Sequence, residues 1–231
     1  MYYKTESGLM LKRGNSYISK NTLILNMGTA SHCPSKIQKL CKHPSICYAW
    51  HSELQYDVAY QYRMKQAEYW LNTPEYHILL DIKEILRKNN LQNKIKYLRI
   101  NESGDFYTQE CVSILYCVAK ELYYEFGIKT YGFTARSDLD FSLYKNSKFI
   151  FIKGSNWEGP NGSTYIYFNN TDKKCLKRCI TVANKMPVEC KGKCGSKCFV
   201  CMSKTSETIV IFKKHGNGVS KCNYFNYLNL P

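Results

Sequence analysis

The sequence lacks any long apolar run. No stretch of about 18 consecutive apolar residues occurs in the 231-residue chain, so we expect no membrane-spanning helix and no membrane contact. The first residues, Met1-Tyr2-Tyr3-Lys4-Thr5-Glu6, also lack the apolar stretch of a secretory signal peptide. These two absences together predict a cytoplasmic protein.

Acidic residues are also scarce relative to basic ones. Lys and Arg number 33 against 18 for Asp and Glu, which gives a formal net charge of +15. A surface of this charge attracts nucleic acid, nucleotides or another polyanion. The basic residues are spread along the chain and are mostly lysines, as codon usage in an AT-rich genome would also produce, so the charge leaves a nucleic-acid partner open.

Cysteine, in contrast, is abundant, with 12 residues. Disulfides do not persist in a reducing compartment, so metal or iron–sulfur ligation is the favoured explanation. A secreted disulfide scaffold is the alternative, but such scaffolds are usually much shorter.

The first cysteine group comprises Cys33, Cys41 and Cys47, in a polar loop between the apolar run 23–28 and a helical pattern. Three thiolate ligands leave one coordination position open, which distinguishes a reactive metal centre from a structural one. A zinc site closed by a fourth, histidine ligand is the alternative, with His32, His43 or His51 in that role.

The second group lies near the C-terminus, with the spacing Cys190-x3-Cys194-x3-Cys198-x2-Cys201. Short steps of this kind let successive thiolates converge on one centre. We expect Cys179, Cys194, Cys198 and Cys201 to hold it, with Cys190 as the main alternate and Cys175 left open. Four ligands make a closed centre, either a 4Fe–4S cluster or zinc, with a structural or electron-carrying role.

The apolar pattern alternates between buried strands and amphipathic helices, which is typical of a parallel sheet with crossover helices. We predict an α/β fold, a partial, half-closed parallel β/α barrel, over residues 1–170. A cysteine-rich metal-binding region, residues 171–231, should pack on the same domain. The expected strands are 23–27, 95–100, 128–133, 148–152, 164–168 and 208–212, and the expected helices are 48–72, 73–90, 108–126 and 138–145. Residues 1–20 should be irregular or form a short hairpin.

Four polar segments, 31–47, 101–106, 134–137 and 153–158, follow predicted strands. Ligands of parallel α/β folds bind at the carboxyl ends of the strands, so we expect these segments to share one site. The candidates there are Glu102, Asp105 and Arg136 for catalysis, and Asn101, Ser103, Gly104, Thr134 and Ser137 for cofactor binding.

Several of these residues have a structural alternative. Asp105 is a candidate cap for a helix that starts near Tyr107, and Thr134 and Ser137 are candidate caps after the third strand. Arg99 and Arg136 can hold a carboxylate or phosphate through the planar guanidinium, or pair with Glu102 and Asp105. Cys111 and Cys117 fit best as small core residues of the helix over 108–126.

The order of these motifs resembles the phage "gene product 88" family over about residues 20–216. The resemblance rests on Cys33-Pro34, Cys41, Cys47-Tyr48-Ala49, Ser103-Gly104-Asp105-Phe106, Phe133-Thr134-Ala135-Arg136-Ser137, the Cys194 to Cys201 spacing and a late His215. It implies a phage or mobile-element origin, and hence the host cell cytoplasm.

The three-cysteine loop is also similar to that of radical S-adenosylmethionine enzymes. This second similarity implies a 4Fe–4S cluster on Cys33, Cys41 and Cys47, with the fourth iron free for the amino and carboxylate groups of S-adenosylmethionine.

Two functions therefore compete. The first is an iron–sulfur, radical S-adenosylmethionine-like protein that acts on nucleic acid or a nucleotide. The second is a non-enzymatic module, stabilised by zinc or an iron–sulfur centre, that binds nucleic acid or a host defence protein. A fourth protein ligand in the first cysteine loop would exclude the enzyme. The oligomeric state is left open.

Overall fold

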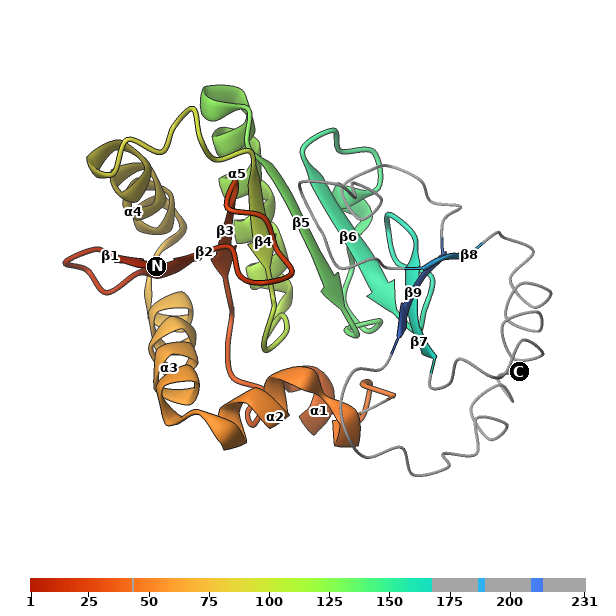
Figure 1. Cartoon of the computed structure of the whole chain (residues 1–231). Coiled ribbons are helices and arrows are strands. Elements are labelled where there is room, and N and C mark those ends of the chain that lie inside the picture. The colour runs from red at the N-terminus through yellow and green to blue at the C-terminus, as the bar shows by residue number, and fades with distance from the viewer. Residues whose placement is uncertain (43, 168–186, 190–208, 214–231) are drawn as a thin grey trace.

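The fold is α/β, with one mixed, mostly parallel sheet (Figure 1). The computed structural model describes residues 1–42, 44–167, 187–189 and 209–213. Six strands run in sheet order as they do in sequence: β1 (Tyr2–Lys4), β2 (Met10–Arg13), β3 (Thr22–Leu25), β4 (Tyr97–Ile100), β5 (Lys129–Thr134) and β6 (Ile150–Ser155). The sheet continues through β7 (Ser163–Tyr167), β9 (Ile209–Lys213) and β8 (Pro187–Glu189).

Strand direction divides the sheet into two parts. β1, β2 and β3 pair antiparallel, which confirms a hairpin near the N-terminus. From β3 to β6 every pair is parallel, as the alternation of strands and helices predicted. The curvature of a half-closed barrel stays a prediction, as does the division into residues 1–170 and 171–231, because most of the second region lies outside the described residues.

The helices largely follow the apolar periodicity. They are α1 (Pro34–Ile37), α2 (Tyr48–Gln55), α3 (Asp57–Asn72), α4 (Glu75–Lys88) and α5 (Gln109–Phe126), with 3-10 turns η1 (Pro44–Ile46) and η2 (Ser142–Tyr144). The single helix predicted over 48–72 is wrong: Tyr56 is extended, with φ −134° and ψ 104°, and separates α2 from α3. The predicted helix over 138–145 is reduced to η2 among the described residues.

Helix ends follow local chemistry in α5. Thr108 is its N-cap and accepts a hydrogen bond from the Cys111 amide, and Gly127 ends it in the left-handed conformation with φ 67°. The helix cap after β4 is therefore Thr108, and the predicted alternative that Asp105 caps this helix is wrong. In α4 the N-cap is Pro74, so the helix begins two residues after the expected start at residue 73.

The two faces of the sheet differ in chemistry. Leu23, Leu98 and Ile150 share one register row and join the apolar core with α4 and α5. The adjacent row, on the other face, contains Arg99 and Tyr131, which are also buried. Within the described residues, no helix is long and apolar enough to span a membrane.

Candidate functional site

The carboxylate of Asp105 joins three of the four predicted site segments. Asp105 is buried, and its Oδ2 accepts hydrogen bonds from Ser35 Oγ (2.6 Å) and the Ala135 amide (2.8 Å). Its Oδ1 accepts from Thr134 Oγ1 (2.7 Å) and the Phe106 amide (2.9 Å). The cysteine loop, the loop after β4 and the end of β5 therefore meet at one carboxylate.

Burial raises the pKa of the Asp105 carboxyl above its ordinary value. The hydrogen bonds from Ser35 and Thr134 oppose that shift, because they stabilise the charged form. With four donors already bound, this carboxylate is suited to hold the segments in place rather than to exchange protons with a ligand.

The fourth predicted segment reaches the same place through Trp157. Its indole Nε1 donates to the Thr134 carbonyl at 2.9 Å. Segments 31–47, 101–106, 134–137 and 153–158 thus lie together, as expected from their positions after strands.

Arg136 forms an ion pair and hydrogen bonds within the protein. Its guanidinium forms a two-pronged ion pair with Asp138, at 2.8 Å for both Nε–Oδ1 and Nη2–Oδ2. Nη1 donates to the carbonyls of Phe106 and Tyr107. Its partner is therefore Asp138, and the predicted alternative pairing with Glu102 or Asp105 is wrong.

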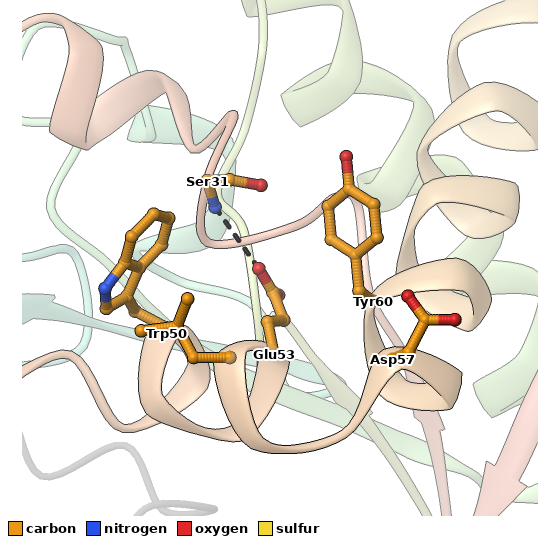
Figure 2. A pocket seen from close by; sticks show the side chains of 6 residues that line it. Ser31, Trp50, Glu53, Asp57 and Tyr60 are labelled. Carbon is orange, nitrogen blue, oxygen red and sulfur yellow. Dashed lines mark hydrogen bonds between the residues drawn. The ribbon is translucent and has the colours of Figure 1, made fainter.

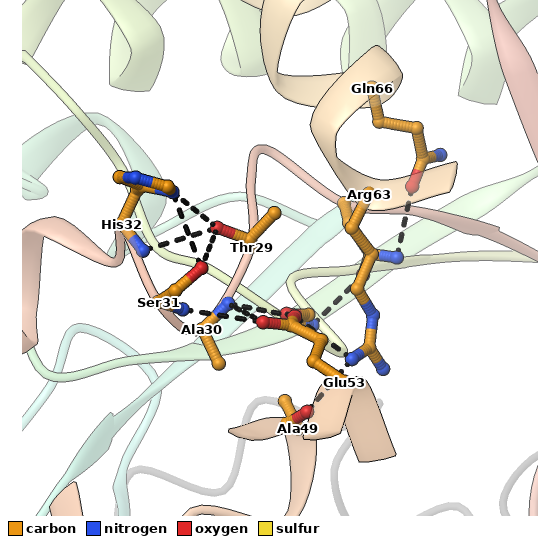
Figure 3. A network of polar contacts seen from close by, with 10 residues as sticks. Thr29, Ala30, Ser31, His32, Ala49, Glu53, Arg63 and Gln66 are labelled. Carbon is orange, nitrogen blue, oxygen red and sulfur yellow. Dashed lines mark hydrogen bonds and ion pairs between the residues drawn. The ribbon is translucent and has the colours of Figure 1, made fainter. Parts of the chain in front are cut away.

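A second carboxylate, Glu53 of α2, anchors the loop that follows β3 (Figure 3). It accepts hydrogen bonds from the Ala30 amide (2.8 Å) and from Ser103 Oγ (3.0 Å), and it pairs with Arg63 of α3 at 3.0 Å. The Glu53 and Arg63 side chains are only 3% and 5% exposed, so the pair is shielded from solvent. Arg63 also donates to the Ala49 carbonyl at 3.0 Å, which ties α2 to α3.

The loops after β3 and β4 pack backbone against backbone. Gly104 has φ 73°, and a Cβ at this position would lie 2.7 Å from the Gly28 amide nitrogen. Asn26 Oδ1 accepts from the Ser103 amide, and Asn101 Oδ1 accepts from the Met27 amide. Gly104 is required here both for its left-handed conformation and for its missing side chain.

The three cysteines of the first group lie on one segment directly after these contacts. Cys33 and Cys47 are the N-cap residues of α1 and α2, and Cys41 lies between them. All three side chains are of intermediate burial. Burial, and to a lesser degree the negative charge of Asp105, raises the pKa of the Cys33 thiol to about 12.

Three thiols are suitable ligands for a thiophilic metal or an iron–sulfur cluster. In this structure, however, the three cysteines are not arranged as a formed centre. Among the residues that the structure describes, no three His, Cys, Asp or Glu side chains are close enough together to hold a metal ion. A centre at this loop therefore requires the loop to bring Cys33, Cys41 and Cys47 closer together.

A surface hollow of about 330 Å³ lies beside this network, lined by Ser31, Trp50, Glu53, Leu54, Asp57 and Tyr60. Figure 2 shows Trp50 and Tyr60 on either side of Glu53. The Lys36 ammonium lies 3.8 Å from the centre of the Trp50 ring. The hollow adjoins the cysteine loop and is lined by two aromatic rings and two carboxylates.

The remaining predicted residues have distinct positions. Glu102 is half-buried and accepts a hydrogen bond from Asn15 Nδ2 at 2.6 Å. Ser137 is exposed and lies three residues after the end of β5. The second cysteine group, Cys179, Cys190, Cys194, Cys198 and Cys201, lies outside the described residues, as do Cys175, His43 and His215.

Sequence reasoning missed Glu53, Arg63 and Gln66. Within the single helix expected over 48–72 they are polar residues between the apolar positions, which predicts solvent exposure, whereas all three are buried. Gln66 accepts from Asn26 Nδ2 at 3.0 Å, so it adds α3 to the same network. An acidic and a basic residue ten positions apart, on either side of a helix break, give no periodic signal.

Comparison with known proteins identifies a family. A family model described as Gene product 88 matches residues 3–159. No curated protein and no solved structure matches the chain.

Proposed function

The chain belongs to the Gene product 88 family, and from that premise we propose that it is a phage iron–sulfur protein related in chemistry to radical S-adenosylmethionine enzymes. Cys33, Cys41 and Cys47 would bind a 4Fe–4S cluster, with S-adenosylmethionine as second cofactor. The observation that supports it best is the hydrogen bond from Ser35 to Asp105, which holds the three-thiol loop against the ends of β4 and β5.

Reductive cleavage of S-adenosylmethionine is the chemistry that such a cluster supplies when bound. The chain's own residues would position the cofactor and exclude water. Asn101 and Ser137 offer polar groups along this edge. Ser103 and Thr134 would act through backbone groups, because their hydroxyls donate to Glu53 and Asp105, and Gly104 would act by letting the loops after β3 and β4 pack together. Asp105 and Arg136 act as positioning residues, because their polar atoms are already bound.

Glu102 is the remaining acid–base candidate. It is half-buried, and its one described hydrogen bond is from the Asn15 amide group. This leaves carboxylate lone pairs for a cofactor amine or for a proton of the substrate.

The second cysteine group completes the proposal. Cys179, Cys194, Cys198 and Cys201, with Cys190 as alternate, would form a closed 4Fe–4S or zinc centre. It would stabilise the C-terminal region or carry electrons.

Metal analysis after anaerobic purification tests the first centre. The triple variant Cys33→Ser, Cys41→Ser, Cys47→Ser should lose about four iron and four sulfide per chain. Cys117→Ser, a half-buried thiol on α5 outside the loop, is the matched control and should keep them. Zinc without sulfide in the wild type, or equal iron in the triple variant and the control, would refute the cluster.

Electron paramagnetic resonance tests the second cofactor. S-adenosylmethionine should alter the spectrum of the reduced wild-type protein, and this change should disappear in the triple variant. An unchanged wild-type spectrum would leave the cluster a structural or redox role only.

A non-enzymatic module that binds nucleic acid or a host protein is the second candidate. This candidate is favoured by the internal hydrogen bonds of Asp105 and Arg136, since side chains whose polar atoms are already bonded are poorly suited to bind or protonate a substrate. Nucleic-acid retention should then fall steeply with salt, because the net charge of +15 drives binding. No retention at low salt would exclude nucleic acid as the partner.

A further inference from the structure

Arg99 is a buried cation on the face of the sheet opposite α4 and α5. It lies in β4, is 8% exposed, and shares its register row with Tyr131 of β5. Figure 1 shows β4, β5 and β6 side by side, and Arg99 lies one residue before the carboxyl end of β4. The neighbouring row pairs Phe133 of β5 with Lys153 of β6, so Arg99 and Lys153 lie on the strands that flank β5.

The contacts of Arg99 leave one nitrogen without a partner. The guanidinium carbon lies 4.3 Å from the Phe133 ring centre and 5.5 Å from that of Tyr131, and Nη2 donates weakly to the Asn101 carbonyl at 3.4 Å. Nη1 is buried and has no hydrogen-bond partner. Among the described residues, no carboxylate lies within ion-pair distance of Arg99.

Asn101, two residues further along, presents a second unused donor. Its Oδ1 accepts from the Met27 amide at 3.2 Å, which fixes the orientation of the side-chain amide. Its Nδ2 is buried and has no partner. Arg99 Nη1 and Asn101 Nδ2 are thus both buried NH2 groups without a hydrogen-bond partner, and the Nη2 contact to the Asn101 carbonyl joins the two residues.

A guanidinium remains charged at all physiological pH values, and an unpaired buried charge is costly. Stacking on Phe133 and Tyr131 offsets part of that cost but supplies no hydrogen-bond acceptor. Lys153, which is fully buried and donates to the Asn161 carbonyl at 2.6 Å, places a second basic side chain on the neighbouring strand β6. Among the described residues, Arg99 Nη1 lacks a negatively charged acceptor.

We propose that this face of the sheet binds an oxyanion, a phosphate or carboxylate group, through Nη1 of Arg99 and Nδ2 of Asn101. An oxyanion has the oxygen lone pairs to accept from both donors and the charge to neutralise the guanidinium. Both nitrogens are covered in this structure, so the anion enters by displacing neighbouring groups. The site uses none of the cysteines and does not depend on a cluster.

Thermal unfolding of the full chain tests the site. In Tris chloride at constant ionic strength, inorganic phosphate or acetate should raise the unfolding temperature of the wild type saturably, and the anion with the larger effect identifies the class. Arg99→Met keeps the contact with the two rings and removes the donors, so it should abolish the response. Arg87→Met, an exposed arginine of α4, is the matched control and should respond as the wild type does.

The same variant separates a ligand site from a structural role. In chloride alone, Arg99→Met should unfold at the wild-type temperature or above, because a buried unpaired charge is removed. If Arg99→Met does not fold, Arg99→Lys keeps the charge without the fork and should bind the anion about tenfold more weakly. A wild type insensitive to both anions, or a response equal in the Arg99 variants and the wild type, would overturn the site.

Discussion

Ser35 donates a 2.6 Å hydrogen bond to the buried carboxylate of Asp105, across 70 positions of sequence. Ser35 lies in α1, two residues after Cys33, and is itself buried. This contact fixes the position of the cysteine loop relative to the sheet. The proposed centre therefore depends on a serine and an aspartate as well as on its thiols.

Removal of this contact should destabilise the fold. We expect Ser35→Ala to lower the free energy of unfolding by about 1–3 kcal/mol, since a buried carboxylate loses a donor. Urea denaturation monitored by circular dichroism would measure it. Ser45→Ala, an exposed serine of the same loop, is the control and should change little. Equal stability of Ser35→Ala and the wild type would contradict this role.

The pH dependence of stability should report on Asp105. The pKa of its carboxyl is raised in the folded state, whereas in the unfolded chain it is about 3.9. At a pH between these two values, the unfolded chain has released the proton and the folded chain still holds it. Stability from this group is therefore fully present below the unfolded pKa and is lost as pH rises through the folded pKa. Asp105→Asn should remove that slope, as urea midpoints measured across pH 4–8 would show. Glu121→Gln, an exposed residue of α5, should leave it in place.

The parallel core of the fold was predictable because its signals are local. The buried strands read as apolar runs, and α5 carries a threonine at its start and Gly127 at its end. The polar segments after the strands could be placed at one edge because parallel strands share their carboxyl ends. Those segments do converge, through Asp105 and Trp157.

The partners within the site were not predictable, for two different reasons. Arg136 pairs with Asp138, two residues away, because of the conformation of the turn after β5, which the residue types alone do not determine. Glu53 reaches Arg63 because Tyr56 is extended and separates α2 from α3, and the helical pattern continues across Tyr56 without any sign of this break.

The Glu53–Arg63 ion pair should be strongly coupled. Arg63→Met leaves a buried carboxylate without its counter-charge, which we expect to cost about 3–5 kcal/mol in unfolding free energy. Adding Glu53→Gln to Arg63→Met should recover part of the loss, because the orphaned charge is removed. A double-mutant cycle by urea denaturation measures this coupling. Lys88→Met, in an exposed pair with Glu84, is the control and should show no measurable effect, whereas additive losses at Glu53 and Arg63 would contradict the coupling.

Gly104 gives the most direct test of the loop contact beneath the proposed site. Gly104 and Gly127 have nearly the same left-handed conformation, with φ 73° and 67°, but a Cβ on Gly127 would meet nothing within 4 Å. Gly127→Ala should therefore cost only the conformational strain, about 1 kcal/mol. Gly104→Ala adds a clash with the Gly28 backbone, which cannot move away as a flexible side chain would, so we expect a loss at least about 1–3 kcal/mol larger.

The difference in unfolding free energy between Gly104→Ala and Gly127→Ala measures the clash with the Gly28 backbone, because the conformational strain is nearly the same in both variants. Urea denaturation of both would measure it. Gly104→Ala should also lower the iron content of the purified protein, because the loop after β4 would separate from the loop that leads to Cys33. Equal losses of stability in the two variants would show that the loops tolerate a side chain between them. The tight packing of the loops after β3 and β4 would then be no requirement of the site.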